Sequence, residues 1–396
     1  MDQRVTDTEM TMVPLGEDYP EIRAGVRAIC DKYPGAYWRK LEKDDEYADD
    51  FVNELSASGY LGALIPEEYG GSGLPLRAGC VILEEIHYSG GSAAACHAQM
   101  YMMGTMLRHG SEEQKQRYLP GIAAGTIRFQ AFGVTEPTTG SDTTQLKTRA
   151  VRQGDKYVVN GQKIWTSRAH KSDLMTLLVR TTALDQVKRR TDGLSVLLVD
   201  LRAVKSGLTM RRIETMINHQ TNELFFDDLE VPVENLIGEE GQGFRYILDG
   251  MNAERILVSG EMLGDARYFI ARASKYAGER VVFGNPIGKN QGIQFPIARA
   301  YAEWKAADMV TRAAAALFQA GKPCGEEANT AKLLASEAAW HAGEACMQTF
   351  GGFAAAKEFD IERKWREARV YQIAPISTNM ILAYIGQHVL GMPRSY

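Results

Sequence analysis

An acidic residue interrupts an apolar helical pattern near the middle of the chain. In DGMNAERILVSG (residues 249–260), Glu254 falls on the helical face that carries the apolar residues at three- and four-residue steps. These apolar residues are Phe244, Ile247, Leu248, Met251, Val258 and Met262. A carboxyl group buried on such a face could move a proton, because burial raises its pKa toward neutrality. Taken alone, however, the pattern favours a residue that reaches solvent or pairs with an arginine of a helical bundle.

A second candidate is the polar segment TEPTTGSD (residues 135–142). It places Thr135, Thr139 and Ser141 close together, and Pro137 fixes a bend between them. Hydroxyls and free backbone N–H groups in an irregular loop suit the polar edge of a ring or a phosphate. Without further context, an ordinary turn made by Ser, Thr and Asp side chains explains the segment better.

The elements that must position these residues change character along the chain. Residues 18–125 have helical periodicity, which PEEYGGSGLP (66–75) interrupts. Residues 128–237 are rich in strand formers, and Asn160-Gly161 predicts a hairpin between two short strands. After residue 238 the chain is helical again. We therefore expect an α+β fold with domains at 1–127, 128–237 and 238–396.

The composition is that of an ordinary soluble globular protein. The 396 residues carry a net charge of −5 with both signs interspersed, which argues against a nucleic-acid or acidic membrane partner. The N-terminus is acidic and has no apolar signal segment, and no uncharged run is long enough to span a membrane. The five cysteines have no metal-ligand spacing, so we expect free thiols, no metal and a cytoplasmic location. They are Cys30, Cys80, Cys96, Cys324 and Cys346.

Several long motifs resemble those of the flavin-dependent acyl-CoA dehydrogenase family. FGVTEPTTGSDTTQLKTRA (132–150) and KYVVNGQKIWTS (156–167) together resemble the family signature. Further similar segments follow the family order and extend the resemblance over essentially the whole chain, at 59–75, 231–244, 279–295 and 347–355. No GxGxxG follows a predicted strand, so a nicotinamide-binding Rossmann site finds no support.

The resemblance implies an N-terminal helical domain, a middle β-barrel, a C-terminal four-helix bundle and a homotetramer with FAD. Residues implied for the isoalloxazine end and its surroundings are Phe132, Val134, Thr135, Ser141, Trp165, Ser167, Ser377 and Asn379. Residues implied for the pyrophosphate and adenine end, supplied by a neighbouring subunit, are Arg280, Phe283, Gln291, Gln348, Gly351 and Gly352. Each also has an ordinary explanation, such as a surface ion pair for Arg280.

The usual position of the family's catalytic base holds no acid in this sequence. Many members carry this base in a Tyr-Glu-Gly-Thr segment, where this chain has Ala374-Pro375-Ile376-Ser377. Proline cannot accept a proton. A branch that includes isovaleryl- and long-chain-type dehydrogenases carries the base on the first helix of the C-terminal bundle, and Glu254 matches that position. The resemblance therefore favours Glu254 as the base that removes the acyl α-proton.

The implied substrate is an acyl-CoA, and the implied oxidant is an electron-transfer flavoprotein. Implied substrate contacts are Ser141, Asn252, Arg255, Ala374 and Pro375. Replacing Tyr-Glu by Ala-Pro removes volume from the acyl wall, which favours a branched, cyclic or bulky acyl group. Arg255 could contact CoA or stabilise the bundle, and the Met-rich segment 97–106 could line the acyl tunnel or belong to the core.

Two other classes of function fit the same scaffold. A flavin monooxygenase or a lyase is compatible with loss of the usual base, although Glu254 and the TEPTTGSD loop argue against both. A non-catalytic module that binds acyl-CoA or flavin is the remaining alternative. The sequence assigns no role to Arg168, His97 or His170.

Overall fold

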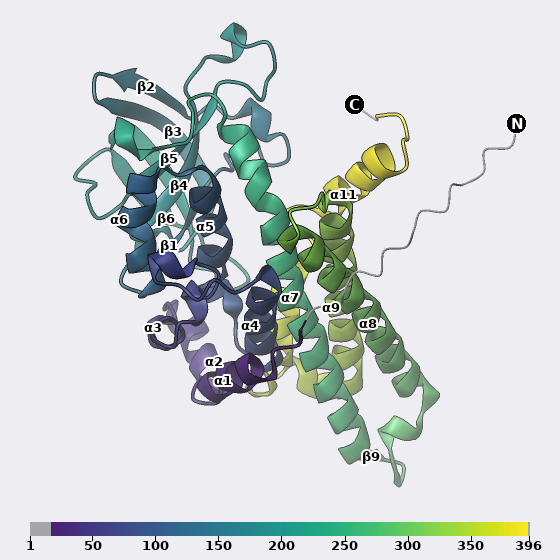
Figure 1. Ribbon diagram of the computed structural model, residues 1–396. Coiled ribbons are helices and arrows are strands. Elements are labelled where there is room, and N and C mark those ends of the chain that lie inside the picture. Colours follow the sequence, from purple (N-terminus) through teal and green to yellow (C-terminus); the bar gives the residue numbers. More distant parts are fainter. Residues whose placement is uncertain (1–16, 395–396) are drawn as a thin grey trace, which may run out of the picture.

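The computed structural model describes residues 17–394, and within these six helices precede the first strand. They are α1 (Pro20–Cys30), α2 (Gly35–Asp44), α3 (Asp49–Ala57), α4 (Leu76–Tyr88), α5 (His97–His109) and α6 (Glu112–Ala123). As predicted, residues 66–75 separate two of these helices. The expected absence of a signal segment concerns residues outside the described range. Figure 1 shows α5 and α6 lying against the sheet, with α4 beside the long helix α7 (Gly243–Glu279).

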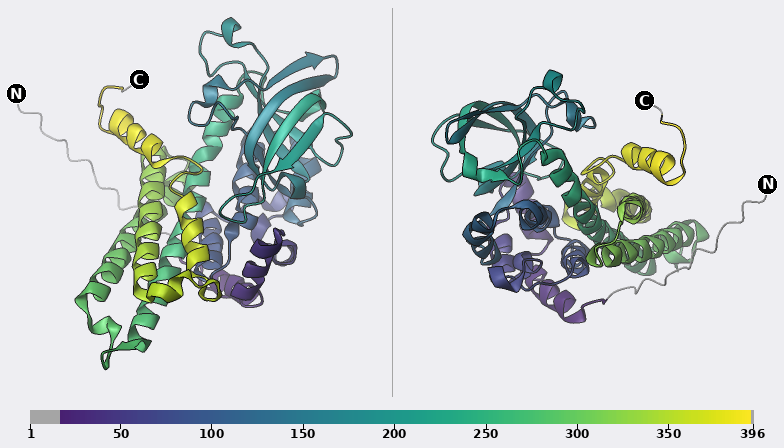
Figure 2. Two further views of the ribbon diagram at one scale, coloured as in Figure 1. Left: turned by 180° about the vertical axis from the view of Figure 1, so that it is seen from behind. Right: turned by 45° about the horizontal axis from the view of Figure 1, so that its top comes forward.

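The middle part of the chain forms one mixed sheet. Its strands are β1 (Phe129–Gly133), β2 (Arg149–Gln153), β3 (Lys156–Ser167), β4 (Leu174–Arg180), β5 (Leu194–Asp200), β6 (Leu208–Arg212), β7 (Thr221–Pro232) and β8 (Leu236–Ile237). They are ordered β6-β7-β3-β2-β4-β5-β8, with β1 paired in parallel to β4. The sheet is strongly curved (Figure 2). Buried residues of β4 and β5 pack against α5, α6 and α7 on one side.

The predicted hairpin at Asn160-Gly161 is wrong, because β3 runs through both residues. The pairing of β3 with β7 is irregular at this point, and Gly161 has a φ of 146°. A Cβ at Gly161 would lie 2.6 Å from Thr148, so the glycine allows a close approach within a bulge. The Asn160 side chain meanwhile exchanges hydrogen bonds with Asp228. The actual turn is at Gly154, between β2 and β3.

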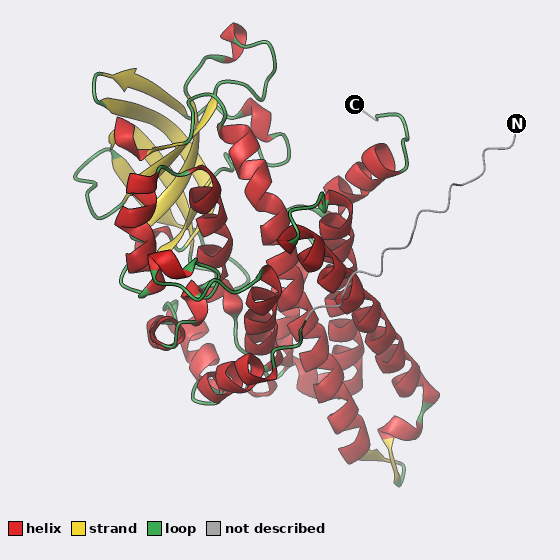
Figure 3. Cartoon of the chain, in the orientation of Figure 1, coloured by secondary structure: helices red, strands yellow, loops and turns green. Residues whose placement is uncertain are grey.

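The C-terminal part is a bundle built on α7, which is 37 residues long. The other helices are α8 (Gln291–Gln319), α9 (Gly325–Phe350), α10 (Ile361–Val370) and α11 (Thr378–Tyr384). A small hairpin of β9 (Val281–Val282) and β10 (Asn285–Pro286) connects α7 to α8 at the tip of the bundle. Figure 3 shows the two helical regions in contact, with the strands of the large sheet at one end and the small hairpin of β9 and β10 at the tip of the bundle. The predicted apolar face is largely confirmed, but Leu248 is exposed.

Small residues allow α4 to approach α7 closely. A Cβ at Gly260 would lie 2.7 Å from the Cys80 carbonyl oxygen, and one at Gly264 would lie 2.2 Å from the Glu84 carbonyl oxygen. Substitution of either glycine would therefore push the two helices apart. Close packing at this interface brings the N-terminal domain against the segment of α7 that carries Glu254.

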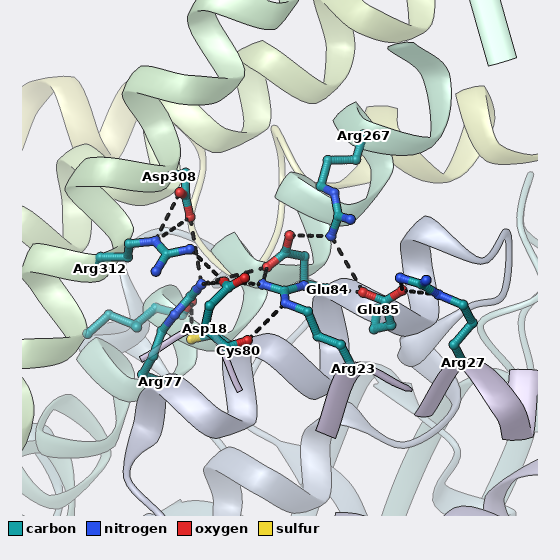
Figure 4. Close-up of polar contacts among 11 residues, drawn as sticks. Asp18, Arg23, Arg27, Arg77, Cys80, Glu84, Glu85, Arg267, Asp308 and Arg312 are labelled. Atoms are coloured by element: carbon teal, nitrogen blue, oxygen red, sulfur yellow. Dashed lines mark hydrogen bonds and ion pairs between the residues drawn. The ribbon is translucent and has the colours of Figure 1, made fainter. Parts of the chain in front are cut away.

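An ion cluster joins the N-terminal helices to the bundle (Figure 4). Glu84 of α4 lies 2.9 Å from Arg23 of α1 and 2.7 Å from Arg267 of α7. Burial alone would raise the pKa of Glu84, but Arg23 and Arg267 outweigh it and hold the pKa below its ordinary value. Asp308 and Arg312 extend the cluster to α8. These contacts fix α4 relative to α7.

Candidate active site

Glu254 lies on α7 with 6% of its surface exposed. Burial raises the pKa of its carboxyl group to about 7, and the negative charge of Glu261 adds to this effect. The neighbouring Arg255 and the hydroxyl of Tyr101 act in the opposite direction. The side chain therefore does not extend into solvent. Its pKa near neutrality suits a group that accepts and releases a proton.

Tyr101 is a site residue that the sequence analysis missed. It belongs to α5 and lies near the Glu254 carboxyl group. Burial and the nearby Glu254 raise its pKa well above the ordinary value, so the phenol stays protonated and can donate. Its ring centre lies 5.7 Å from that of His97 and 6.5 Å from that of Phe132. In the sequence, the only indication of this role is that Tyr101 is the one tyrosine in the Met-rich segment 97–106.

Arg255 and the segment containing Pro375 lie on either side of Lys332. The Lys332 amino group donates to the Ile376 carbonyl at 2.7 Å, and burial together with nearby Arg255 lowers its pKa to about 8. Arg255 donates to Asn252 at 2.9 Å, while its Nε has no partner among the described residues. Helix α7, which carries Glu254, and the segment 374–377, which lacks the usual acid, therefore both lie near the buried Lys332. The free Nε leaves both predicted roles of Arg255 possible.

A buried ion pair holds the loop that follows β1. The Lys163 amino group lies 2.9 Å from a Glu136 oxygen and also donates to the Val134 carbonyl at 2.9 Å. Glu136 in turn accepts the backbone N–H groups of Lys147 and Thr148. Burial lowers the pKa of Lys163 to about 8, although Glu136 opposes this shift. Glu136 and Lys163 lie inside the motifs at 132–150 and 156–167, but the sequence alone indicates no role for either.

Two parts of the first group of predicted flavin residues, the loop after β1 and the end of β3, are joined to each other. A hydrogen bond of 2.9 Å from the Ile164 N–H to the Thr135 carbonyl joins the loop after β1 to the end of β3. Trp165 has a positive φ of 62° and is 57% exposed, which presents its indole for contact. Thr139 and Thr166 have hydroxyls without partners among the described residues. The uncovered indole of Trp165 suits contact with the face of a flavin ring.

Ser377 and Asn379 lie at the start of α11. The Ser377 hydroxyl accepts the Met380 N–H at 3.4 Å and caps the helix, and Asn379 is exposed. Ser141 is also exposed, in the loop after β1. The methionines of 97–106 are buried core residues, as one of the two predicted interpretations has it.

The second group of predicted flavin residues lies at the other end of the bundle. Arg280 lies over the ring of Phe353 at 5.9 Å, which brings the segment after α7 next to the one after α9. Phe283 is fully exposed at the hairpin of β9 and β10, far from the sheet in Figure 1. Exposed residues of this group are Arg280, Phe283, Gln291, Gln348, Gly351 and Gly352. The two groups do not meet within one chain.

One cluster of described residues has the geometry of metal ligands, namely His87, Asp265 and Glu367. The Lys364 amino group lies 2.8 Å from Asp265 and 2.6 Å from Glu367, so it already supplies the positive charge. All five cysteines are buried free thiols, as predicted. Of the helices in the described range, none combines the length and the apolarity that a membrane crossing requires.

Family models match nearly the full length of the chain. "Acyl-CoA dehydrogenase, N-terminal domain" matches residues 16–126, the middle-domain model matches 131–229 and the C-terminal-domain model matches 241–390. The chain belongs to the acyl-CoA dehydrogenase family. As a member, it is a flavoprotein oxidoreductase that introduces an α,β double bond into the acyl group of a CoA thioester. The monooxygenase and lyase alternatives are not favoured.

Individual relatives support the same assignment. Acyl-CoA dehydrogenase FadE12 of Mycobacterium tuberculosis is 31% identical over 383 residues, which cover 96% of this chain and 98% of that protein. Cyclohex-1-ene-1-carbonyl-CoA dehydrogenase of Syntrophus aciditrophicus is 33% identical over 402 residues, covering 99% and 94%. A solved glutaryl-coenzyme A dehydrogenase in complex with glutaryl-CoA superposes with a TM-score of 0.89 at 29% identity, covering 96% and 97%.

Proposed function

We propose that Glu254 is the catalytic base of this acyl-CoA dehydrogenase and removes the α-proton of the acyl thioester. The observation that carries the proposal is a buried carboxyl group on α7 with a pKa of about 7. Ala374-Pro375 offers no proton acceptor at the position used by many family members. At neutral pH a base with this pKa is ionised in a large fraction of molecules. Because its pKa is higher than that of an exposed carboxylate, it also binds the abstracted proton more tightly.

In this mechanism the α-proton moves to a Glu254 oxygen, and the electron pair of the broken C–H bond forms the double bond as the β-hydrogen departs. A bound flavin would supply the hydride acceptor for that hydrogen. Tyr101 of α5 lies near this carboxyl group, and its raised pKa keeps the phenol protonated.

We further propose that the flavin is FAD and that its site is completed by a second copy of the chain in a homotetramer. The support is the separation of the two predicted residue groups along the bundle (Figure 1). Arg280 would supply positive charge for the pyrophosphate, and Gly351 and Gly352 would allow a close backbone approach. Phe283, which is fully exposed in one chain, would be covered by the neighbouring subunit.

A branched, cyclic or otherwise bulky acyl group is the proposed substrate class. Ala374 and Pro375 are smaller than the Tyr-Glu pair of many members, which leaves more room at the acyl end of the site. That a relative is named for a cyclic acyl-CoA is in keeping with this class. We also propose an electron-transfer flavoprotein as the oxidant and the cytoplasm as the location.

The test is anaerobic flavin bleaching by straight, branched and cyclic acyl-CoAs in the wild type, E254Q and E21Q. Glu21 is an exposed acid on α1 and serves as the matched control. We expect acyl-CoA to bleach the flavin of the wild type and of E21Q without any other reductant. In E254Q the flavin should stay bound, and the rate of bleaching should fall about 10²–10⁴-fold. Bleaching of E254Q at the wild-type rate would refute the assignment.

A further inference from the structure

A small cavity lies where the N-terminal helices, the sheet and α10 meet. Its volume is about 50 Å³, and its walls come from α2 and the loop after it, the segment before α5, the end of β3, the loop between β6 and β7, and α10. None of its lining residues is predicted to bind flavin or acyl-CoA. Leu41, Glu46 and Tyr47 also line a hollow at the surface, so the cavity lies next to solvent.

Arg168 brings a buried positive charge to this cavity. It directly follows β3, has a φ of 58° and is only 3% exposed. Its Nε has no partner among the described residues, and the polar side-chain atom that its guanidinium contacts is His97 Nε2, at 3.5 Å. A guanidinium stays protonated in proteins and can only donate. A charge removed from water without a partner of opposite charge is costly, so an anion in the cavity would stabilise this arginine.

Four other charged side chains line the cavity, and each of them already has a partner of opposite charge. The pairs are Glu42–Arg366, Glu46–Lys40, Glu367–Lys364 and Arg363–Asp360, at distances of 2.6–3.2 Å. The three carboxylates are therefore neutralised locally. In the part of the chain that the structure describes, Arg168 is the charged group of the cavity without an ion pair.

His219 supplies a second polar atom without a partner. Its Nε2 is buried and makes no hydrogen bond to a described residue. Burial and the positive charge of Arg168 lower the pKa of His219 to about 3, so the ring is neutral near pH 7. A neutral imidazole donates from one of its nitrogens and accepts through the other. The cavity thus offers an anion a charged donor and a neutral one.

The walls of the cavity are fixed by hydrogen bonds between segments far apart in the sequence. The Asn218 side chain donates to the Glu46 carbonyl at 2.9 Å, and the Gln220 side chain donates to the Asp45 carbonyl at 3.0 Å. The backbone N–H of Arg168 donates to the Gln220 carbonyl at 2.8 Å. These bonds hold the loop between β6 and β7 against both the loop after α2 and the end of β3. A preformed site saves a ligand the cost of ordering it.

We propose that this cavity binds a small carboxylate such as acetate, with the carboxylate on Arg168 and the methyl group against the apolar part of the wall. That part consists of Trp38, Leu41 and Ile217, which are all buried. A volume of about 50 Å³ holds about four water molecules, which is close to the four heavy atoms of acetate. A planar carboxylate also matches the fork of donors on a guanidinium. The site is separate from Glu254 and does not depend on its proposed role.

The experiment measures binding of ¹³C-labelled acetate to the flavin-loaded protein by NMR line broadening. Chloride keeps the ionic strength constant, and acetamide serves as a ligand of the same shape without charge. R168M removes the guanidinium, and I217F fills the cavity while leaving Arg168 in place. R77M is the matched control, because Arg77 is also buried and also has an unpartnered Nε, but has Asp18 and Asp308 within ion-pair distance.

We expect one saturable acetate site per chain in the wild type and R77M, with a dissociation constant of about 1 mM, as suits so small a ligand. In R168M and I217F the dissociation constant should rise at least about tenfold, and acetamide should bind at least about tenfold more weakly to the wild type.

Wild-type affinity for acetate in R168M would overturn the proposal, as would a lack of saturable binding to the wild type. An equal loss of affinity in R77M would also overturn it, because the effect would then follow from removing any buried arginine. Should R168M fail to retain its flavin, I217F and acetamide still decide the question. Unchanged acetate affinity in I217F, or acetamide binding as tight as that of acetate, would contradict the site.

Discussion

The amino group of Lys163 on β3 lies 2.9 Å from a carboxylate oxygen of Glu136, and both side chains are buried. This pair connects the sheet to the loop that carries most of the residues predicted to face the flavin. Glu136 accepts two backbone N–H groups from the far side of that loop, at Lys147 and Thr148. The conformation of the loop therefore depends on one charged pair in a region without solvent.

Replacement of Lys163 should weaken both folding and flavin binding. K163M leaves Glu136 buried without a cation, a change that costs about 3–5 kcal/mol of unfolding free energy. We expect a lower urea midpoint and a dissociation constant for FAD raised at least tenfold. K156M is the control, because Lys156 lies on the same strand and its ion pair is exposed. Equal FAD affinity in K163M and K156M would contradict this role of the pair.

The pH dependence of the reaction should report Glu254 directly. The base must be ionised to accept a proton, and its pKa is about 7. We expect kcat/KM to fall about tenfold per pH unit below 7 and to level off above it. A rate profile that is flat from about pH 5 to 8 would show that another group removes the proton.

The same pKa predicts that E254Q is more stable than the wild type at high pH. The pKa of Glu254 rises from the ordinary 4.5 to about 7 in the folded state, so the folded protein binds the proton more tightly. Stability contributed by this group therefore decreases as pH rises from 4.5 to 7 and stays low above. At pH 8 we expect E254Q to gain up to about 3 kcal/mol in urea unfolding, with no gain below pH 4.5. A constant difference at all pH values would rule out this origin.

Glu84 should matter for stability and not for chemistry. E84Q removes the carboxylate shared by Arg23 and Arg267, and we expect a loss of about 3–5 kcal/mol. Because the pKa of Glu84 is lowered on folding, its contribution is present above pH 4.5 and is lost as the pH falls below that value. Flavin reduction at pH 8 should match that of E21Q. A tenfold slower reduction in E84Q with the flavin bound would show that the cluster also affects the site.

Much of the fold could be predicted from local sequence patterns. The helices that precede and follow the sheet in the chain can be predicted from their periodicity. The strands of 174–180 and 194–200 can be predicted from their strand propensity. The error at Asn160-Gly161 has a physical reason, since a glycine that permits a turn also permits a bulge and only the neighbouring strand decides between them. Leu248 matches the helical period, but the bundle does not extend far enough to cover it.

The candidate site could be predicted only in part, for a different reason. Glu254 can be recognised from the sequence because the other residues on its face of the helix are apolar. Tyr101, Lys163 and Lys332 matter through partners on other elements, and no local pattern in the sequence records those contacts. Arg168 is comparable, because its contact with His97 of α5 cannot be predicted from its sequence neighbours.

The most direct test of the central claim follows the α-hydrogen itself. A 3-thia-acyl-CoA, with sulfur in place of the β-carbon, has an acidic α-hydrogen and no β-hydrogen to transfer. In D₂O the wild type and E21Q should exchange the α-hydrogens of this analogue for deuterium, as measured by NMR. E254Q should exchange them at least about 100-fold more slowly. Exchange by E254Q at the wild-type rate would contradict the account.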